Sequence, residues 1–168
     1  MTGGDKVGVA HKFGDDINTD YIIASSRKRD TADPQKLARF LMEDIRPGFG
    51  LQVRKGDFLV AGRNFGCGSA MEIAPLAVMA AGIRAVIAKS YARSFYRNAI
   101  NLGFLVFEAD TDLIAQGDLL EVDPSGLIHD VTKAKRIHTK PFPPLIKEIL
   151  DAGGIIPYLE GKYPMPST

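Results

Sequence analysis

Short apolar runs, separated by Gly, Pro and Asp, divide the chain into strand-length and helix-length segments. Alternating or continuous apolar positions predict strands in four segments, which are KVGVAHKF (6–13), VRKGDFLVAG (53–62), IRAVIAKS (83–90) and FLVFEA (104–109). A helical pattern lies between the last two, so they form a strand–helix–strand unit. The pattern therefore indicates a mixed α/β fold.

Helical spacing predicts two longer helices. The first begins at Pro34 behind Asp33 as N-cap and stops at Pro47-Gly48. Its apolar face is formed by Leu37, Phe40, Leu41 and Ile45. The second covers YARSFYRNAINLG (91–103), with Gly103 just past its end. Its apolar face is formed by Tyr91, Phe95, Ala99 and Leu102.

The remaining segments predict shorter elements. A short helix ends at Gly82, and a helical turn lies near Leu113. A hairpin crosses Asp123-Pro124-Ser125-Gly126, and a final helix of about ten residues runs from Pro144 to Gly153-Gly154. No repeat and no Pro/Gly/Ser linker divides the chain, so we expect a single domain over residues 1–168.

The densest chemical feature is NFGCGSAME (64–72). Two glycines flank Cys67 directly before Ser69, which allows the backbone to bend sharply and approach a ligand closely. Ser69 and Glu72 fit a capping box, which places Ser69 at a helix start among unpaired amides that favour an anion or a serine alkoxide. Pro75 conflicts with a helix starting there, so the alternative is a start nearer Ala74, with Ser69 on a preceding turn.

The same pattern is also typical of a structural glycine turn, and the pattern alone does not decide between the two. The segment is neither a G-x-S-x-G elbow nor a phosphate-binding Walker loop.

A second candidate lies in SSRKRDTADP (25–34), which we interpret as a polar loop. It brings Arg27, Lys28 and Arg29 together, and a guanidinium is the usual partner for a carboxylate held in one orientation. The segment is long enough to close over a site as a lid. An ordinary solvated surface loop is the alternative.

Charge and cysteine content narrow the function classes. The 168 residues carry 21 Lys and Arg against 20 Asp and Glu, a formal charge of +1, so no general attraction to nucleic acid or anionic lipid is expected. No apolar run reaches the roughly 18 residues of a membrane span, and the opening MTGGDK has no leader pattern, so we expect a cytoplasmic protein.

The sequence also offers no set of residues that is typical of a metal site. One cysteine, Cys67, excludes an internal disulfide and cannot alone hold an iron–sulfur cluster. His11, His129 and His138 show no metal-ligand spacing, so we expect no metal site in this chain.

Three segments carry a family likeness: GDDINTDYII (14–23), NFGCGSAMEIAP (64–75) and IAKSYARSFYRNAINLG (87–103). Together they resemble the small subunits of isopropylmalate isomerase (3-isopropylmalate dehydratase), and more broadly the swivelling domain of the aconitase superfamily. The closing ILDAGGIIPYL (149–159) is similar to the family's C-terminal helix and turn. The resemblance implies an aconitase-type swivelling β/β/α domain, in which a mixed sheet has flanking helices.

The resemblance also implies a partner and a reaction. In this family a cluster-bearing large subunit holds a [4Fe–4S] cluster, and the small subunit closes over the site. The likeness implies that this chain binds no cofactor itself and acts with that partner on a small dicarboxylate or tricarboxylate. The reaction is dehydration of a 2-hydroxy diacid to an alkene and rehydration at the neighbouring carbon, as in leucine biosynthesis, with iron as Lewis acid and a serine as base.

Ser69 matches the family's catalytic serine. The substrate-binding residues that the resemblance implies are Arg27, Lys28, Arg29, Gly66, Cys67, Gly68, Ala70 and Met71. Arg29 aligns best with the family's loop arginine, and Arg27 is the alternative because the segment is one residue longer here.

The sequence departs from the family directly after Ser69. Family members usually continue with serine and arginine, whereas Ala70 and Met71 follow here. Either a cation from 27–29 supplies the missing charge, or the substrate presents an apolar group at that place. The alternatives are therefore a paralogous subunit for homoaconitate or a methyl-substituted malate, or a non-catalytic diacid-binding module.

Overall fold

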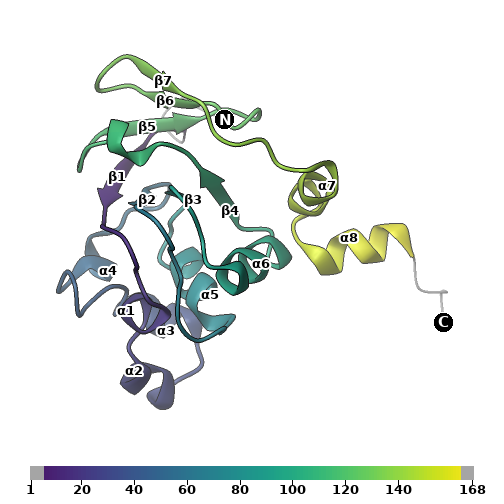
Figure 1. Ribbon diagram of the computed structural model, residues 1–168. Coiled ribbons are helices and arrows are strands. Elements are labelled where there is room, and N and C mark those ends of the chain that lie inside the picture. Colours follow the sequence, from purple (N-terminus) through teal and green to yellow (C-terminus); the bar gives the residue numbers. More distant parts are fainter. Residues whose placement is uncertain (1–5, 164–168) are drawn as a thin grey trace.

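The computed structural model describes residues 6–163, in which seven strands form one curled mixed sheet (Figure 1). The spatial order is β4-β3-β2-β1-β5-β6-β7. The strands are β1 (Gly8–Lys12), β2 (Phe58–Ala61), β3 (Ala85–Ala88), β4 (Leu105–Glu108), β5 (Leu119–Val122), β6 (Ile128–Asp130) and β7 (Lys135–Ile137). Strands β1 to β4 pair in parallel, whereas β5, β6 and β7 continue from β1 in antiparallel pairing.

The central parallel strands β2 and β3 are buried on both faces, which explains their continuous apolar sequences. Alternate residues enter two different cores because successive side chains of a strand point to opposite faces. Leu59 and Val86 join the core under the helices, whereas Phe58 and Ile87 join the core under β5–β7. The antiparallel strands thus replace a helical layer on one face of the parallel sheet.

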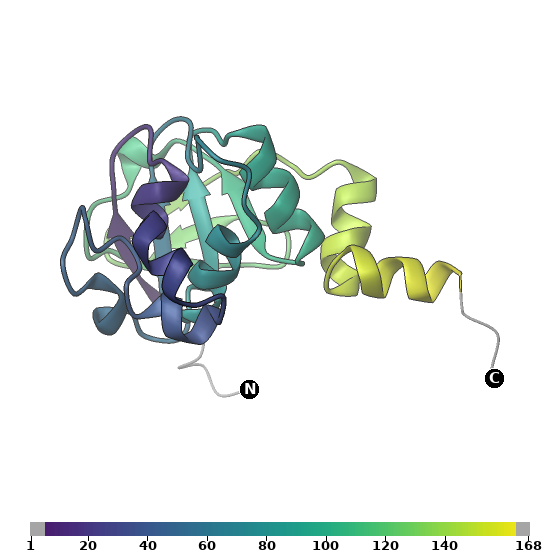
Figure 2. The same ribbon diagram turned by 90° about the horizontal axis from the view of Figure 1, so that it is seen from below.

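Helices cover the opposite face (Figures 1 and 2). The described residues form the helices α1 (Thr19–Ile22), α2 (Ser25–Asp30), α3 (Pro34–Ala38), α4 (Phe49–Gln52), α5 (Ile73–Ala80), α6 (Arg93–Asn101), α7 (Pro144–Ala152) and α8 (Ile155–Lys162), with a 3₁₀ turn η2 (Thr111–Leu113). Helices α2 and α8 bury no residue, and α8 extends away from the sheet beyond α7 (Figure 2). Helix α6 joins β3 to β4, so the predicted strand–helix–strand unit is confirmed. The hairpin at 123–126, the turn near Leu113 and the helix ending at Gly153 are also confirmed.

The predicted helix from Pro34 to Pro47 is wrong in length. Asp33 caps it by accepting a hydrogen bond from the Gln35 amide at 2.9 Å, as expected, but α3 ends at Ala38. Met42 then adopts a left-handed φ of 57°, and its amide bonds to Ile22 O at 3.0 Å. This turn buries Met42 fully and leaves Ile45 41% exposed, contrary to the predicted apolar face.

Three further expectations need correction. Residues 25–30, which the sequence analysis interprets as a loop, form α2. The sequence does not indicate this helix because the segment has no apolar periodicity. The chain also continues beyond Gly154 into α8, so the helix at 144 is not the last. Tyr91 precedes α6 and pairs with Phe65 in a short parallel bridge instead of lying on the helix.

The opening segment, in which no leader was found, lies outside the described residues except for Lys6. Across 6–163, none of the helices combines the length and apolar character that a bilayer span requires.

A buried carboxylate connects β1 to the turn before β2. Asp57 is 4% exposed and accepts hydrogen bonds from the Val9 amide at 3.0 Å, the Arg54 amide at 2.9 Å and His11 Nε2 at 2.8 Å. Burial raises the pKa of Asp57, but the bonds from His11 and the two amides outweigh burial and hold that pKa below its ordinary value.

We expect Asp57→Asn to lower the free energy of unfolding by about 2 to 3 kcal/mol at neutral pH, because charge-assisted bonds are lost inside the fold. The stabilisation by Asp57 is complete above its unfolded pKa of about 3.9 and is lost as pH falls through the lower folded pKa. Urea unfolding between pH 7 and pH 3 measures both effects. A variant as stable as the parent at pH 7 would contradict this role for Asp57.

Candidate active site

The candidate site forms where segments leave the carboxyl ends of β1, β2 and β3. The segment after β2 lies between the other two: Gly66 N donates to Ile17 O at 2.8 Å, and Ala92 N donates to Phe65 O at 2.9 Å. Thr19 N donates to Cys67 O at 2.8 Å, which pairs Asn18 with Cys67 as a short parallel bridge. Ligands of open α/β sheets bind outside these strand ends.

Two glycines shape the central turn, which we call the glycine turn (residues 66–70). Gly66 and Gly68 have φ values of 81° and 91°, a left-handed backbone that favours glycine. A Cβ on Gly66 would overlap the side chain of Phe95 from α6, and one on Gly68 would collide with the Asn18 amide. The close approach on both sides therefore requires glycine at both positions.

The glycine turn leaves consecutive amides unused. Within residues 6–163, the N–H groups of Gly68, Ser69 and Ala70 donate no hydrogen bond to the protein, and all three residues are exposed. Successive unpaired amides of this kind form anion-binding concavities. The turn is therefore suited to hold a carboxylate or to stabilise an alkoxide.

Ser69 lies in the middle of these amides. Its carbonyl accepts bonds from Thr19 Oγ1 at 3.1 Å and Met71 N at 3.0 Å, which fix the backbone, while its hydroxyl bonds to no described residue. The predicted capping box with Glu72 is wrong: α5 begins at Ile73, and its N-cap Glu72 makes no side-chain bond. Pro75 is the third residue of α5, where its missing N–H costs nothing, so the alternative that places Ser69 on a preceding turn is confirmed.

Helix α2 carries the three predicted cations, and Arg27 is turned toward α3. Arg27 donates to both carboxylate oxygens of Glu43, at 2.8 and 3.1 Å, and its guanidinium lies 3.8 Å from the centre of the Phe40 ring. The hydrogen bond to Glu43 raises the pKa of Arg27. This pair attaches α2 to the turn after α3.

Lys28 points instead toward the glycine turn. Its Nζ lies 2.8 Å from Asp20 Oδ1 and 3.5 Å from Met71 Sδ, and only 10% of its side chain is exposed. Hydrogen bonds from Lys28, and then from Ser25, lower the pKa of Asp20. Lys28 therefore brings a cation to the side chain that stands where the family usually has arginine.

Arg29 is exposed and forms no hydrogen bond or ion pair with any residue in 6–163. The structure thus separates the three neighbouring cations into one that attaches α2, one beside Met71 and one without a protein partner.

The sequence did not single out Asp20, Glu43 or Thr19. Their roles depend on contacts between residues as far as 50 positions apart, which periodicity does not reveal. Asp20 and Thr19 do lie within the GDDINTDYII segment that carries the family likeness, and this is the only signal of them in the sequence.

No group of three or more His, Cys, Asp or Glu side chains in residues 6–163 is arranged to hold a metal ion. Cys67, the single cysteine of the sequence, is half-buried in the glycine turn. The chain is consistent with having no iron–sulfur cluster of its own.

Known proteins match both the sequence and this architecture. Residues 42–112 match the family model of the aconitase C-terminal domain. The 3-isopropylmalate dehydratase small subunit 1 of Archaeoglobus fulgidus is 52% identical over 154 residues, 90% of this chain and 95% of that protein. The corresponding small subunit of Thermodesulfovibrio yellowstonii is 48% identical over 161 residues, covering 94% and 95%. The chain belongs to the family of 3-isopropylmalate dehydratase small subunits.

A solved structure agrees with this family membership. The 3-isopropylmalate dehydratase of Methanocaldococcus jannaschii superposes with a TM-score of 0.88 at 48% identity, covering 93% of each chain. The predicted mixed sheet with flanking helices of the aconitase-type small-subunit fold is thereby confirmed.

We expect Gly66→Ala to lower the free energy of unfolding by about 3 kcal/mol, because it adds both a left-handed alanine and an overlap with Phe95. Gly14→Ala is the matched control, since a Cβ there has no neighbour within 4 Å and is expected to change stability by less than about 0.5 kcal/mol. Urea unfolding of both variants measures the difference. Equal stabilities would show that the close packing does not hold the turn.

Proposed function

We propose that this chain works with a large subunit to interconvert 2-isopropylmalate and 3-isopropylmalate by dehydration and rehydration. The observation that carries the proposal is the exposed glycine turn, in which an unpaired serine hydroxyl and three free amides lie near a cation from α2. The relatives, which are 3-isopropylmalate dehydratase small subunits, supply the substrate and the subunit relationship. We place this activity in the cytoplasm and in leucine biosynthesis.

The single cysteine of the chain does not suffice for a cluster, so we assign the [4Fe–4S] cluster to the large subunit. When bound there, the cluster would supply a Lewis acid for the substrate hydroxyl.

Ser69 would act as the base in this arrangement. Its Oγ removes the proton from the substrate carbon next to a carboxylate, and the C–H electron pair forms the alkene as the hydroxyl leaves the neighbouring carbon. Serine is a weak base, so its alkoxide needs stabilisation. The free amides of Gly68, Ser69 and Ala70 provide it at fixed positions, and they would also hold a substrate carboxylate.

Lys28 would replace the guanidinium that the family usually places after the serine. Its Nζ already lies at Met71, and its bond to Asp20 fixes its direction. Arg29 has no protein partner in residues 6–163 and would bind the same carboxylate from the solvent side. Arg27 would not touch the substrate, because its Nε and Nη2 donate to Glu43 and its guanidinium lies over the Phe40 ring.

The direct test is anaerobic reconstitution with the cluster-bearing large subunit of the same organism. Alkene formation is followed by ultraviolet absorbance with 3-isopropylmalate, homoisocitrate and dimethylmalate in parallel. We expect turnover of 3-isopropylmalate. Turnover of another diacid alone would make Ala70 and Met71 a change of specificity, and no turnover with a bound, cluster-loaded partner would favour a binding module.

In the same assay, Ser69→Ala is expected to lower kcat at least about a hundredfold while the complex still assembles, because a general base is removed. Ser125→Ala deletes an equivalent hydroxyl in the hairpin between β5 and β6, far along the sheet from the turn, and is expected to leave turnover unchanged. Full turnover of the Ser69 variant would exclude Ser69 as the base.

Lys28→Gln is expected to raise KM for 3-isopropylmalate about tenfold with a smaller change in kcat, because a charge-assisted contact to the bound substrate is lost. Lys36→Gln removes an exposed lysine from α3 and serves as the control. Steady-state kinetics of the reconstituted complex separate KM from kcat. If both variants keep the parent KM, Lys28 does not bind the substrate.

A further inference from the structure

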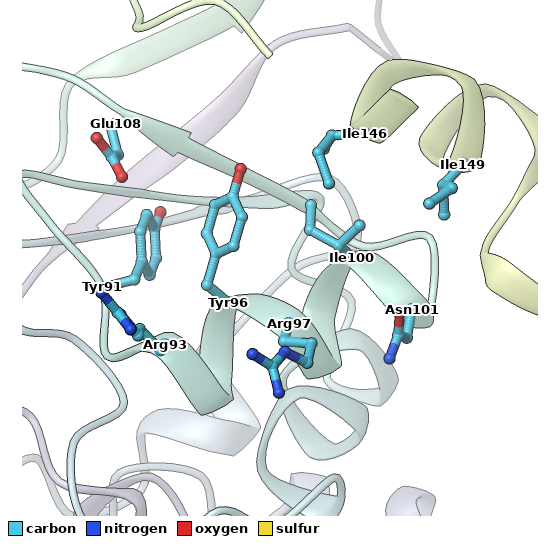
Figure 3. A pocket seen from close by; sticks show the side chains of 9 residues that line it. All are labelled: Tyr91, Arg93, Tyr96, Arg97, Ile100, Asn101, Glu108, Ile146 and Ile149. Carbon is cyan, nitrogen blue, oxygen red and sulfur yellow. The ribbon is translucent and has the colours of Figure 1, made fainter. Parts of the chain in front are cut away.

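A cavity of about 350 Å³ lies between α6 and α7, apart from the glycine turn (Figure 3). Phe95 of α6 packs toward the turn, in edge contact with Phe65 at 5.0 Å between ring centres. The neighbouring residues Tyr96 and Arg97 line the cavity instead. The volume lies within the range of small-molecule sites, about 300 to 1,000 Å³.

One wall of the cavity is aliphatic. Ile100 from α6 and Ile149 from α7 are 3% and 6% exposed, and Ile146 is half-buried one turn earlier on α7. Figure 3 shows the three isoleucines gathered at the α7 end, with the Tyr96 ring rising from α6 beside them. This wall suits a branched aliphatic group, which it would remove from water.

The opposite edge is cationic. Arg93 and Arg97 lie one helical turn apart on α6, both exposed, and neither forms a hydrogen bond or ion pair with a residue in the described range 6–163. Like charges at this spacing repel each other. Other cations of the chain are paired, since Lys89 lies 2.6 Å from Asp112 and Lys147 lies 2.5 Å from Asp151.

The one carboxylate at the cavity does not neutralise these arginines. Glu108 pairs with Lys140, with 3.3 Å between its Oε2 and the lysine Nζ. Figure 3 shows Glu108 and Arg97 on opposite sides of the Tyr96 ring. The two guanidiniums are therefore unpaired within residues 6–163 and line the same cavity as the three isoleucines.

We propose that this cavity binds a small monocarboxylate with a branched aliphatic body. The carboxylate accepts hydrogen bonds from the guanidiniums of Arg97 and Arg93, and the aliphatic body packs on Ile100, Ile146 and Ile149. This site is separate from Ser69 and does not depend on the proposed reaction, so it is tested on the full chain without its partner.

The experiment is a titration of the isotope-labelled chain with 4-methylpentanoate, followed by amide chemical shifts. We expect saturable shifts in α6 and at the start of α7. Acetate, which lacks the aliphatic body, and 4-methylpentanol, which lacks the charge, are each expected to bind at least about tenfold more weakly. The spectrum of every variant also reports whether it is folded.

Arg97→Gln is expected to weaken 4-methylpentanoate binding about tenfold, whereas Arg39→Gln, at an exposed arginine directly after α3, leaves it unchanged. Ile146→Ser is expected to weaken 4-methylpentanoate binding and leave acetate binding unchanged. The proposal is overturned by any of three results: no saturable shift, shifts centred on the glycine turn, or equal losses in the Arg97 and Arg39 variants.

Discussion

Close backbone contact at the carboxyl edge of the parallel strands is the constraint on which the candidate active site depends. The glycine turn lies between Asn18 on one side and Phe95 on the other, with no room for a side chain at Gly66 or Gly68. The segments that follow β1 and β3 form hydrogen bonds with the backbone amides and carbonyls on both sides of the turn. The free amides that follow are therefore held at fixed positions before any ligand arrives.

Helix α2 adds charge to this fixed turn through contacts of a weaker kind. Arg27 bonds to Glu43 and Lys28 to Asp20, and both pairs are partly exposed, so these ion pairs hold α2 only weakly. A segment held in this way would open at low cost, as the lid predicted from the sequence requires. In the function that we propose, the turn would position the reacting groups, and α2 would supply a charge that distinguishes substrates.

The centre of the sheet was predictable because β2 and β3 are buried on both faces and their apolar runs are unbroken. Gly103 and the N-cap Asp33 were predictable because their local backbone chemistry decides where a helix ends or begins. The early end of α3 was not, since it depends on Met42 turning to reach Ile22 across the fold. Tertiary packing there overrides a helical pattern that extends to Ile45.

The candidate active site shows the same difference between features that local sequence predicts and features that depend on distant contacts. The glycine spacing around Cys67 indicated a sharp turn next to Ser69. The spacing of Ser69 and Glu72 suggested a helix cap that the structure does not form, whereas Pro75 indicated the preceding turn that it does form. The partners of Arg27 and Lys28 lie up to 43 positions away, so the residue pattern did not separate the three cations, and the family likeness favoured Arg29. The most direct test is a crystal structure of the reconstituted complex with a non-reactive analogue of 3-isopropylmalate. Our account predicts a carboxylate on the amides of residues 68–70, with Lys28 beside it and Ser69 Oγ facing the reacting carbon. A bound analogue that leaves those amides to solvent would contradict it.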